Sequence, residues 1–364
     1  MPRPLFVDFA RVGDLVMAVP LMRALASQGE LHLLARPYAA ALLAGSRQSF
    51  VSGVHVHPHP NHTGLKRLLH RRSWARLERE LRAADIDVVY RFAKERRPLV
   101  RFLERTLGEA AVCELQRDPQ LRTTAHYSQS NDAWLRSAGI DPDAHERAPR
   151  LEIHPEPLAR ADALLAPFPA RLVAVQMGSH TTWRTHPLKA TRPNIKSPAP
   201  EQWAALIAHL LACKACDAVT AHGVRGEAHL VKRVRALLPA ALRPRLLDCC
   251  GTVPLPILPA VLHRHQALIS CDTGPAHVAA AVGCPVLVFF GPSDPVHYTM
   301  MGTGPVEVLH APVDCAPCLG TQRAKHCHDN RCLTDITLEQ MIAGWDRLLA
   351  RADSKRSDAR PQGA

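Results

Sequence analysis

Apolar segments that alternate with helical patterns are the feature that most limits what this chain can fold into. In the second half, five such segments have the length and composition of strands: 171–177, 217–222, 245–250, 267–272 and 285–290. Helical patterns separate or follow them, at 200–212, 227–238, 256–264 and 275–282. A strand that is apolar on both faces belongs in a parallel sheet covered by helices on both sides. The second half therefore predicts a Rossmann-like α/β domain.

The first half shows the same alternation in weaker form. Its predicted strands are 4–10, 31–36, 54–58 and 87–93, and its predicted helices are 14–28 and 65–84. Prolines and charges crowd the segment 139–157, which we interpret as an interdomain linker. The predicted organisation is two Rossmann-like domains, 1–150 and 151–336, then a helix at 337–351 and a disordered tail at 352–364.

The composition limits the classes of partner that we expect for this chain. The chain has 364 residues and 47% of them are hydrophobic, but no apolar run approaches the roughly 18 residues that a membrane span needs. The first residues lack the apolar centre and cleavage site of a signal peptide, so we expect a cytoplasmic protein. A net charge of +12 predicts an anionic partner: nucleic acid, a phosphorylated substrate or a membrane surface.

Basic residues are concentrated between residues 61 and 105, where 13 Lys or Arg face 6 Asp or Glu. This stretch lacks the interleaved aromatic residues of single-strand binders and any groove-reading motif, so we do not expect nucleic acid. Much of it lies on one amphipathic helix, which suits a phosphorylated acceptor or an anionic membrane surface. A solvated basic face is the alternative interpretation.

The segment 267–295 contains the most distinctive turn. A predicted strand ends at Asp272, and Thr273, Gly274 and Pro275 then form a tight turn that opens a helix carrying His277. Ligands bind at the carboxyl ends of strands in such sheets, and a helix N-terminus attracts anions. The turn therefore indicates a phosphate site, although many purely structural strand–helix turns have the same pattern.

Five motifs occur in order along the chain: RVGDLVMAVPLMRAL (11–25), QMGS (176–179), KSPAPEQWAAL (196–206), HGVRGE (222–227) and DTGPAHVAAAVGCPVLVFFGPSDP (272–295). Together they resemble glycosyltransferase family 9, the ADP-heptose:lipopolysaccharide heptosyltransferases. The resemblance implies the GT-B architecture, in which two Rossmann-like domains face a central cleft. It also implies an inverting, metal-independent transfer from a nucleotide sugar, ADP-heptose, to a phosphorylated glycolipid. That acceptor is the lipopolysaccharide inner core, which implies peripheral contact with the cytoplasmic face of the inner membrane.

The same resemblance suggests two catalytic residues. Asp14 matches the family's catalytic base, although an Asp here also suits the N-terminus of the following helix. Lys196 matches the lysine that offsets charge on the departing diphosphate. The match at Lys196 is imperfect, because the tryptophan expected two residues later is missing. Basic residues of the preceding loop are therefore alternatives: Arg184, Lys189 and Arg192.

The donor site implied by the resemblance contains further residues. Glu227 matches a carboxylate that contacts the ribose, and the alternative is a charge that opens the next helix. The other implied donor-site residues are Gly178, Ser179, Asp272, Thr273, Gly274 and His277. His277 also suits a packed helix position. We interpret the second Gly-Pro turn, at 291–292, as structural.

Four cysteines are left outside this scheme: Cys315, Cys318, Cys327 and Cys332, spaced C-x2-C-x8-C-x4-C. They suit a tetrahedral metal site, a loop of reduced thiols or a disulfide. We expect the functional site to contain no metal and to require no cofactor. Three function classes stay open: a glycosyltransferase, a non-catalytic GT-B protein that binds a sugar nucleotide, and a Cys-quartet metal protein on an α/β scaffold.

Overall fold

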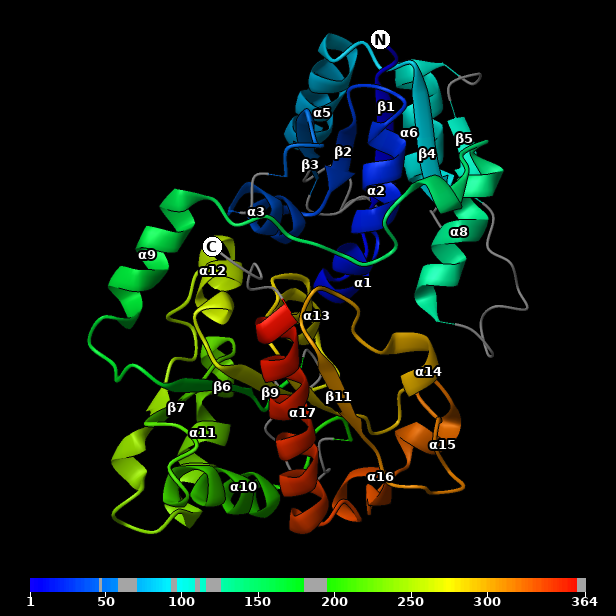
Figure 1. Cartoon of the computed structure of the whole chain (residues 1–364). Coiled ribbons are helices and arrows are strands. Elements are labelled where there is room, and N and C mark those ends of the chain that lie inside the picture. Colours follow the sequence, from blue (N-terminus) through cyan, green and yellow to red (C-terminus); the bar gives the residue numbers. More distant parts are fainter. Residues whose placement is uncertain are drawn as a thin grey trace. The chain divides into compact units, whose positions relative to one another are not determined.

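A computed structural model describes the chain at residues 1–45, 48–57, 71–92, 97–108, 112–115, 126–179 and 195–358. The chain divides into two compact units, Met1–His154 and Pro155–Ala364. Each unit is built on its own sheet (Figure 1).

The first unit holds a parallel sheet in the order β3-β2-β1-β4-β5. Its strands are β1 (Pro4–Asp8), β2 (His32–Ala35), β3 (Gly53–Val56), β4 (Val88–Phe92) and β5 (Val112–Leu115). Its helices are α1 (Val12–Met17), α2 (Val19–Ala26), α3 (Pro37–Gly45), α5 (Arg71–Ala83), α6 (Arg97–Leu107) and α8 (Tyr127–Ser137), followed by the short η2 (Pro142–Ala144). The central strand β1 is buried along its whole length, as its apolar sequence predicts.

Two helices of this unit differ in detail from the sequence prediction. The helix expected at 14–28 is divided at Ala18, because Pro20 occupies the first turn of α2 and has no N–H to continue the helical bonding. In the helix expected at 65–84, residues 65–70 lie outside the described residues. The remainder forms α5, which buries Trp74, Leu77 and Leu81.

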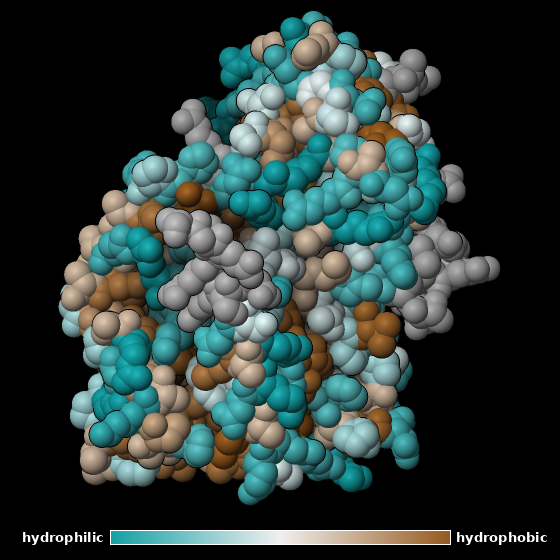
Figure 2. Space-filling view, in the orientation of Figure 1, coloured by the Kyte–Doolittle hydropathy of each residue, from teal (hydrophilic) through white to brown (hydrophobic). Residues whose placement is uncertain are grey.

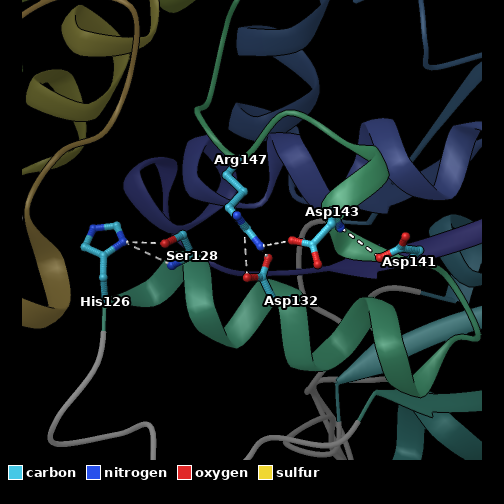
Figure 3. A network of polar contacts seen from close by, with 6 residues as sticks. All are labelled: His126, Ser128, Asp132, Asp141, Asp143 and Arg147. Atoms are coloured by element: carbon cyan, nitrogen blue, oxygen red, sulfur yellow. Dashed lines mark hydrogen bonds and ion pairs between the residues drawn. The ribbon is translucent and has the colours of Figure 1, made fainter.

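Much of the proline-rich segment 139–157, which we expected to be an interdomain linker, is bound to the first unit by side-chain contacts. Arg147 donates to Asp132 of α8 at 3.1 Å and to Asp143 at 2.5 Å (Figure 3). Figure 3 also shows His126, whose ring nitrogen accepts the Ser128 N–H at 3.1 Å and so caps the start of α8. The boundary between the units falls after these contacts, at His154.

The second unit holds a larger parallel sheet in the order β11-β10-β9-β6-β7-β8. Its strands are β6 (Leu172–Gln176), β7 (Ala218–Ala221), β8 (Leu246–Asp248), β9 (Ala267–Cys271), β10 (Val286–Phe289) and β11 (Val306–Leu309). Its longer helices are α9 (Pro155–Leu165), α10 (Pro200–Ala212), α11 (Ala228–Leu237), α12 (Leu258–His263), α13 (Gly274–Ala281) and α17 (Leu338–Asp358). Short helical turns complete it: η4 (Arg225–Glu227), η5 (Arg243–Arg245), η6 (Leu255–Ile257), α14 (Pro295–Tyr298), α15 (Gln322–Lys325) and α16 (Arg331–Thr334).

The last helix continues beyond its expected end at 351. Figure 1 shows α17 alongside β11, and Arg347 and Arg351 both pair there with Glu307 of that strand. Ala352 is buried and the Lys355 ammonium donates to the Thr303 carbonyl, so tertiary contacts extend the helix to Asp358. Residues 359–364 of the expected tail lie outside the described residues.

Two parallel sheets with covering helices confirm the predicted α/β class. Figure 2 shows hydrophilic and apolar residues interspersed over the visible face of the chain. Within the described residues, no helix combines the length and apolar character that crossing a bilayer requires.

Candidate functional site

In the second unit, four neighbouring strands end at one edge of the sheet. Along the sheet the order is β10, β9, β6 and β7, and all four strands are parallel. Their carboxyl ends therefore bring together the loops that follow them, which are the positions where ligands bind in such sheets. Most of the predicted donor-site residues lie in these loops.

Asp272 follows β9 and forms an ion pair with Lys196. The Lys196 ammonium lies 2.7 Å from Oδ2 of Asp272, and each side chain is 11% exposed. The Ser293 hydroxyl donates to the same carboxylate oxygen at 2.5 Å. Burial by itself would raise the pKa of Asp272, but Lys196, Ser293 and His277 together outweigh it and hold the pKa below its usual value. Asp272 is therefore a carboxylate, and it fixes the position of the ammonium group.

The turn after Asp272 opens helix α13. Thr273 has an extended backbone, Gly274 is the first helical residue and Pro275 occupies the first turn. Proline is favoured there because its missing N–H would have no partner inside the helix. His277 is 4% exposed and lies close enough to Asp272 to lower the pKa of that carboxyl. The positive end of α13, Lys196 and His277 thus lie together.

Glu227 forms a second cluster at the same sheet edge, at the end of η4. Its Oε2 accepts the Val224 N–H at 3.0 Å and the Gln176 side-chain N–H at 3.4 Å. Burial raises the pKa of Glu227, while the two donors act in the opposite direction. The contact with Val224, three residues earlier, is the helix-opening contact of the alternative interpretation.

Two glycines make room for the Glu227 carboxylate. A methyl group on Gly178 would lie 2.1 Å from Oε1, and one on Gly223 would lie 2.4 Å from Oε2. Any larger residue would displace the carboxylate or the loop. Ser179, next to Gly178, is buried.

Asp14 lies in the first unit, in the first turn of α1. Asp14 is the third residue of α1 and its Oδ2 accepts the Arg11 N–H at 3.3 Å, so it supports the start of the helix from inside the first turn and is not the N-cap of a helix that begins at Leu15. The side chain is only partly buried, which leaves it accessible to a ligand. Tyr38 lies nearby: burial raises its pKa, and the negative charges of Asp8 and Asp14 add to that increase.

The structure thus brings Lys196, Asp272, Thr273, Gly274 and His277 together and places Glu227 with Gly178 on an adjoining strand end. Sequence reasoning missed two members, Ser293 and Gln176. Ser293 follows the turn that we had interpreted as structural. That turn alone does not identify Ser293, because only the pairing of β10 with β9 brings it beside Asp272. The alternative cations Arg184, Lys189 and Arg192 lie outside the described residues.

The cysteine quartet lies wholly within the described residues. None of its members forms a disulfide. No cluster of three or more His, Cys, Asp or Glu side chains in the described part of the chain is arranged to hold a metal ion.

Comparison with known proteins assigns the family. The sequence profile of glycosyltransferase family 9 (heptosyltransferase) matches residues 144–328, about half of the chain. The chain belongs to glycosyltransferase family 9. The matched region includes the Lys196–Asp272 pair, Glu227 and the start of α13, so the family match and the site coincide.

Individual relatives of this family 9 chain are distant. Lipopolysaccharide heptosyltransferase 1 of Pseudomonas aeruginosa is 35% identical over 104 residues, which is 28% of this chain and 27% of that protein. The chain therefore matches only about a quarter of that curated relative's length.

Two solved structures share the fold over nearly the whole chain. The ADP-heptose lps heptosyltransferase II of E. coli aligns with a TM-score of 0.72 at 16% identity, covering 97% of this chain and all of that one. A family 9 glycosyl transferase from Veillonella parvula gives 0.74 at 17% identity, covering 96% and 97%. These alignments confirm the predicted two-Rossmann, GT-B fold class.

Proposed function

We propose that this chain transfers a heptose from ADP-heptose to a lipopolysaccharide inner-core acceptor by an inverting reaction that requires no metal. The single observation that carries the proposal is the Lys196–Asp272–Ser293 cluster beside the N-terminus of α13. Family membership and the similarity to known lipopolysaccharide heptosyltransferases support the donor and acceptor classes.

The second unit binds the donor in this proposal. Glu227 accepts hydrogen bonds from the ribose hydroxyls, and Gly178 and Ser179 line the adjoining loop. The diphosphate lies at the start of α13, where Thr273, Gly274 and the helix dipole favour negative charge. Lys196 adds positive charge beside it, and His277 lies close by.

Lys196 stabilises the leaving group. As the bond between the anomeric carbon and the phosphate oxygen breaks, its electron pair goes to ADP and negative charge builds on the diphosphate. A cation held in advance stabilises that charge without reorganisation. Asp272 and Ser293 supply the fixed position, since a lysine side chain otherwise has many rotamers.

Asp14 acts as the base. The acceptor hydroxyl attacks the anomeric carbon on the face opposite the phosphate, a new carbon–oxygen bond forms, and the hydroxyl proton passes to the Asp14 carboxylate. The products are the glycosylated acceptor with inverted configuration, ADP, and a protonated Asp14 that returns its proton to water.

The acceptor's charge suits helices α5 and α6 of the first unit. These helices contact each other and expose eight arginines: Arg71, Arg72, Arg76, Arg79, Arg82, Arg97, Arg101 and Arg105. Only Arg76 and Arg82 pair with carboxylates among the described residues, with Glu80 and Glu78. This surface supports binding of a phosphorylated glycolipid rather than nucleic acid. In our proposal the protein acts in the cytoplasm, in peripheral contact with the inner membrane.

The test is transfer with purified protein. ADP-heptose and truncated, phosphorylated core acceptors are incubated with the wild-type chain and with Asp14→Asn, and products are identified by mass spectrometry. We expect a single heptose addition that survives chelator treatment and that Asp14→Asn slows strongly. Binding of ADP-heptose without transfer to any core acceptor would instead support a non-catalytic sugar-nucleotide-binding protein.

A further inference from the structure

The cysteine-rich segment, defined here as residues 315–334, is attached to the turn that carries Ser293. The backbone N–H groups of Cys318 and Leu319 both donate to the Pro292 carbonyl, at 2.9 and 2.8 Å. The next residue is Ser293, which is 1% exposed and donates its hydroxyl to Asp272. One end of the segment therefore holds the turn that supports the Asp272 carboxylate.

The other end of the segment is attached to the loop that carries Lys196. The Asn330 side-chain amide donates to the Ser197 carbonyl at 3.4 Å, and Asn330 is 3% exposed. Gln202 reinforces this attachment: its amide nitrogen donates to the Leu333 carbonyl at 3.0 Å, and its oxygen accepts the Ala199 N–H at 2.9 Å. The backbone at Ser197 and at Ala199 is thus connected to residues 330–333.

The Lys196 loop, the Ser293 turn and the cysteine-rich segment meet at Gly291. A methyl group built on Gly291 would lie 2.8 Å from the Ile195 carbonyl oxygen and 2.8 Å from a Leu333 methyl. Contacts this short leave no room for a side chain, so the Lys196 loop, the Ser293 turn and the cysteine-rich segment pack directly against one another.

We propose that the cysteine-rich segment is a clip that holds Lys196 and Asp272 in contact with each other. Asn330 of the clip and Ser293 of the neighbouring turn are the positioning residues. The two residues of the ion pair lie 76 positions apart in the sequence, on different loops. The clip binds the Lys196 loop at Ser197, and it reaches Asp272 through the turn that carries Ser293. Small displacements of a group that must meet a diphosphate are costly, so the clip tunes donor binding and transfer. The catalytic consequence rests on the proposed function above.

The attachments of the clip to Pro292 come from backbone N–H groups, so they do not depend on the thiols. Cys318→Ser should therefore keep donor kinetics unchanged. A clip that worked through a metal or a disulfide would lose activity in this variant, and that outcome would overturn the backbone mechanism.

The direct test compares Ser293→Ala, Ser293→Thr and Asn330→Asp with a control, Ser270→Ala. Ser270 is also fully buried in this unit, but its hydroxyl donates to the Cys271 carbonyl rather than to Asp272. Asp tolerates the left-handed backbone of residue 330, where φ is 50°; it removes the amide donor and adds a negative charge. The readouts are the Kd for ADP by calorimetry, kcat and KM for ADP-heptose, and the Tm.

We expect Ser293→Ala to lower kcat/KM for ADP-heptose by about 10-fold, the scale of one hydrogen bond to a charged group. Asn330→Asp should lower it by about 5-fold, because the Ser197 carbonyl is a neutral acceptor. Ser293→Thr, which keeps the hydroxyl, should restore most of the loss. Ser270→Ala should match the wild type in kinetics even if its Tm falls as far as that of Ser293→Ala. Wild-type kinetics in both Ser293→Ala and Asn330→Asp would overturn the clip.

A second readout needs no donor and so separates the clip from the proposed function. Acetylation of Lys196 by acetic acid N-hydroxysuccinimide ester, followed by peptide mass spectrometry, reports how firmly the ammonium is held. We expect slow labelling in the wild type and in Ser270→Ala, and about 10-fold faster labelling in Ser293→Ala and Asn330→Asp. Equal labelling in all four proteins would overturn the clip even if heptose transfer is confirmed. Faster labelling would support it even if ADP-heptose is not the donor.

Discussion

Replacing Lys196 by Met should destabilise the second unit in a way that depends on pH. The side chains of Lys196 and Asp272 are both 11% exposed and lie 2.7 Å apart. Removing one partner of a buried pair leaves an uncompensated charge and typically costs 3–5 kcal/mol. Because the Ser293 hydroxyl still donates to Asp272, we expect the lower end, about 3 kcal/mol at pH 7.

The pH dependence follows from Asp272. In the wild type its pKa is lowered, so the carboxylate contributes stability above its unfolded pKa of about 4, and that contribution is lost as the pH falls. In Lys196→Met, burial is no longer offset by the ammonium and the folded pKa rises above the unfolded value. The variant then regains stability as Asp272 takes up a proton. The stability difference between the two proteins should therefore shrink between pH 7 and pH 4.5.

The assay is urea unfolding at both pH values for the wild type, Lys196→Met, Asp272→Asn and the double variant. The double variant should lose less than the sum of the two single losses, and the difference measures the coupling of the pair. Wild-type stability of Lys196→Met at pH 7, or a gap that widens toward pH 4.5, would refute this account of the cluster.

Three further predictions concern the base, the basic helices and acid stability. Asp14→Asn should lower turnover by about 10²-fold while ADP affinity and Tm stay unchanged, and near-normal turnover would make Asp14 a helix cap only. Arg71→Glu with Arg72→Glu should raise the KM for a phosphorylated acceptor, and not that for ADP-heptose, with an effect that shrinks in high salt. Unchanged acceptor KM at low salt would contradict this. Burial lowers the pKa of His222 to about 3 and of His265 to about 4, so both are neutral in the folded protein. Stability should fall by about 1.4 kcal/mol per pH unit for each as the pH drops below 6.5, and His222→Gln should reduce that slope in urea unfolding between pH 7 and 5.

The sequence predicted the central strands well because they are apolar on both faces, and it missed strands whose pattern depends on distant contacts. β5 is short and its first three residues are partly or fully exposed, so it has no apolar run to recognise. β11 carries Glu307 in its centre, which breaks the apolar pattern. Arg347 and Arg351 of α17 neutralise that carboxylate, and this pairing is visible only in the folded chain.

The sequence likewise identified some residues of the candidate site and missed those whose partners are distant in the chain. The turn pattern at 272–274 and the family resemblance were enough to select Asp272 and Lys196, and the structure places the two in contact. Ser293 could not be selected from its own turn, because its partner is 21 residues away. Only the pairing of β9 with β10, in which Phe289 lies opposite Cys271, puts the following residues side by side.

Glu227 and Asp272 show most clearly what a single sequence leaves undetermined. Both are carboxylates near strand–helix turns at one sheet edge, and pattern alone gives them the same description. In the structure the ammonium of Lys196 lowers the pKa of Asp272, whereas burial raises the pKa of Glu227, which has backbone and amide donors as its partners. A carboxylate bound to a cation orients that cation, and one surrounded by neutral donors remains an acceptor for hydroxyl groups. The different neighbours therefore support different roles in our proposal, with Asp272 positioning Lys196 at the diphosphate and Glu227 binding the ribose.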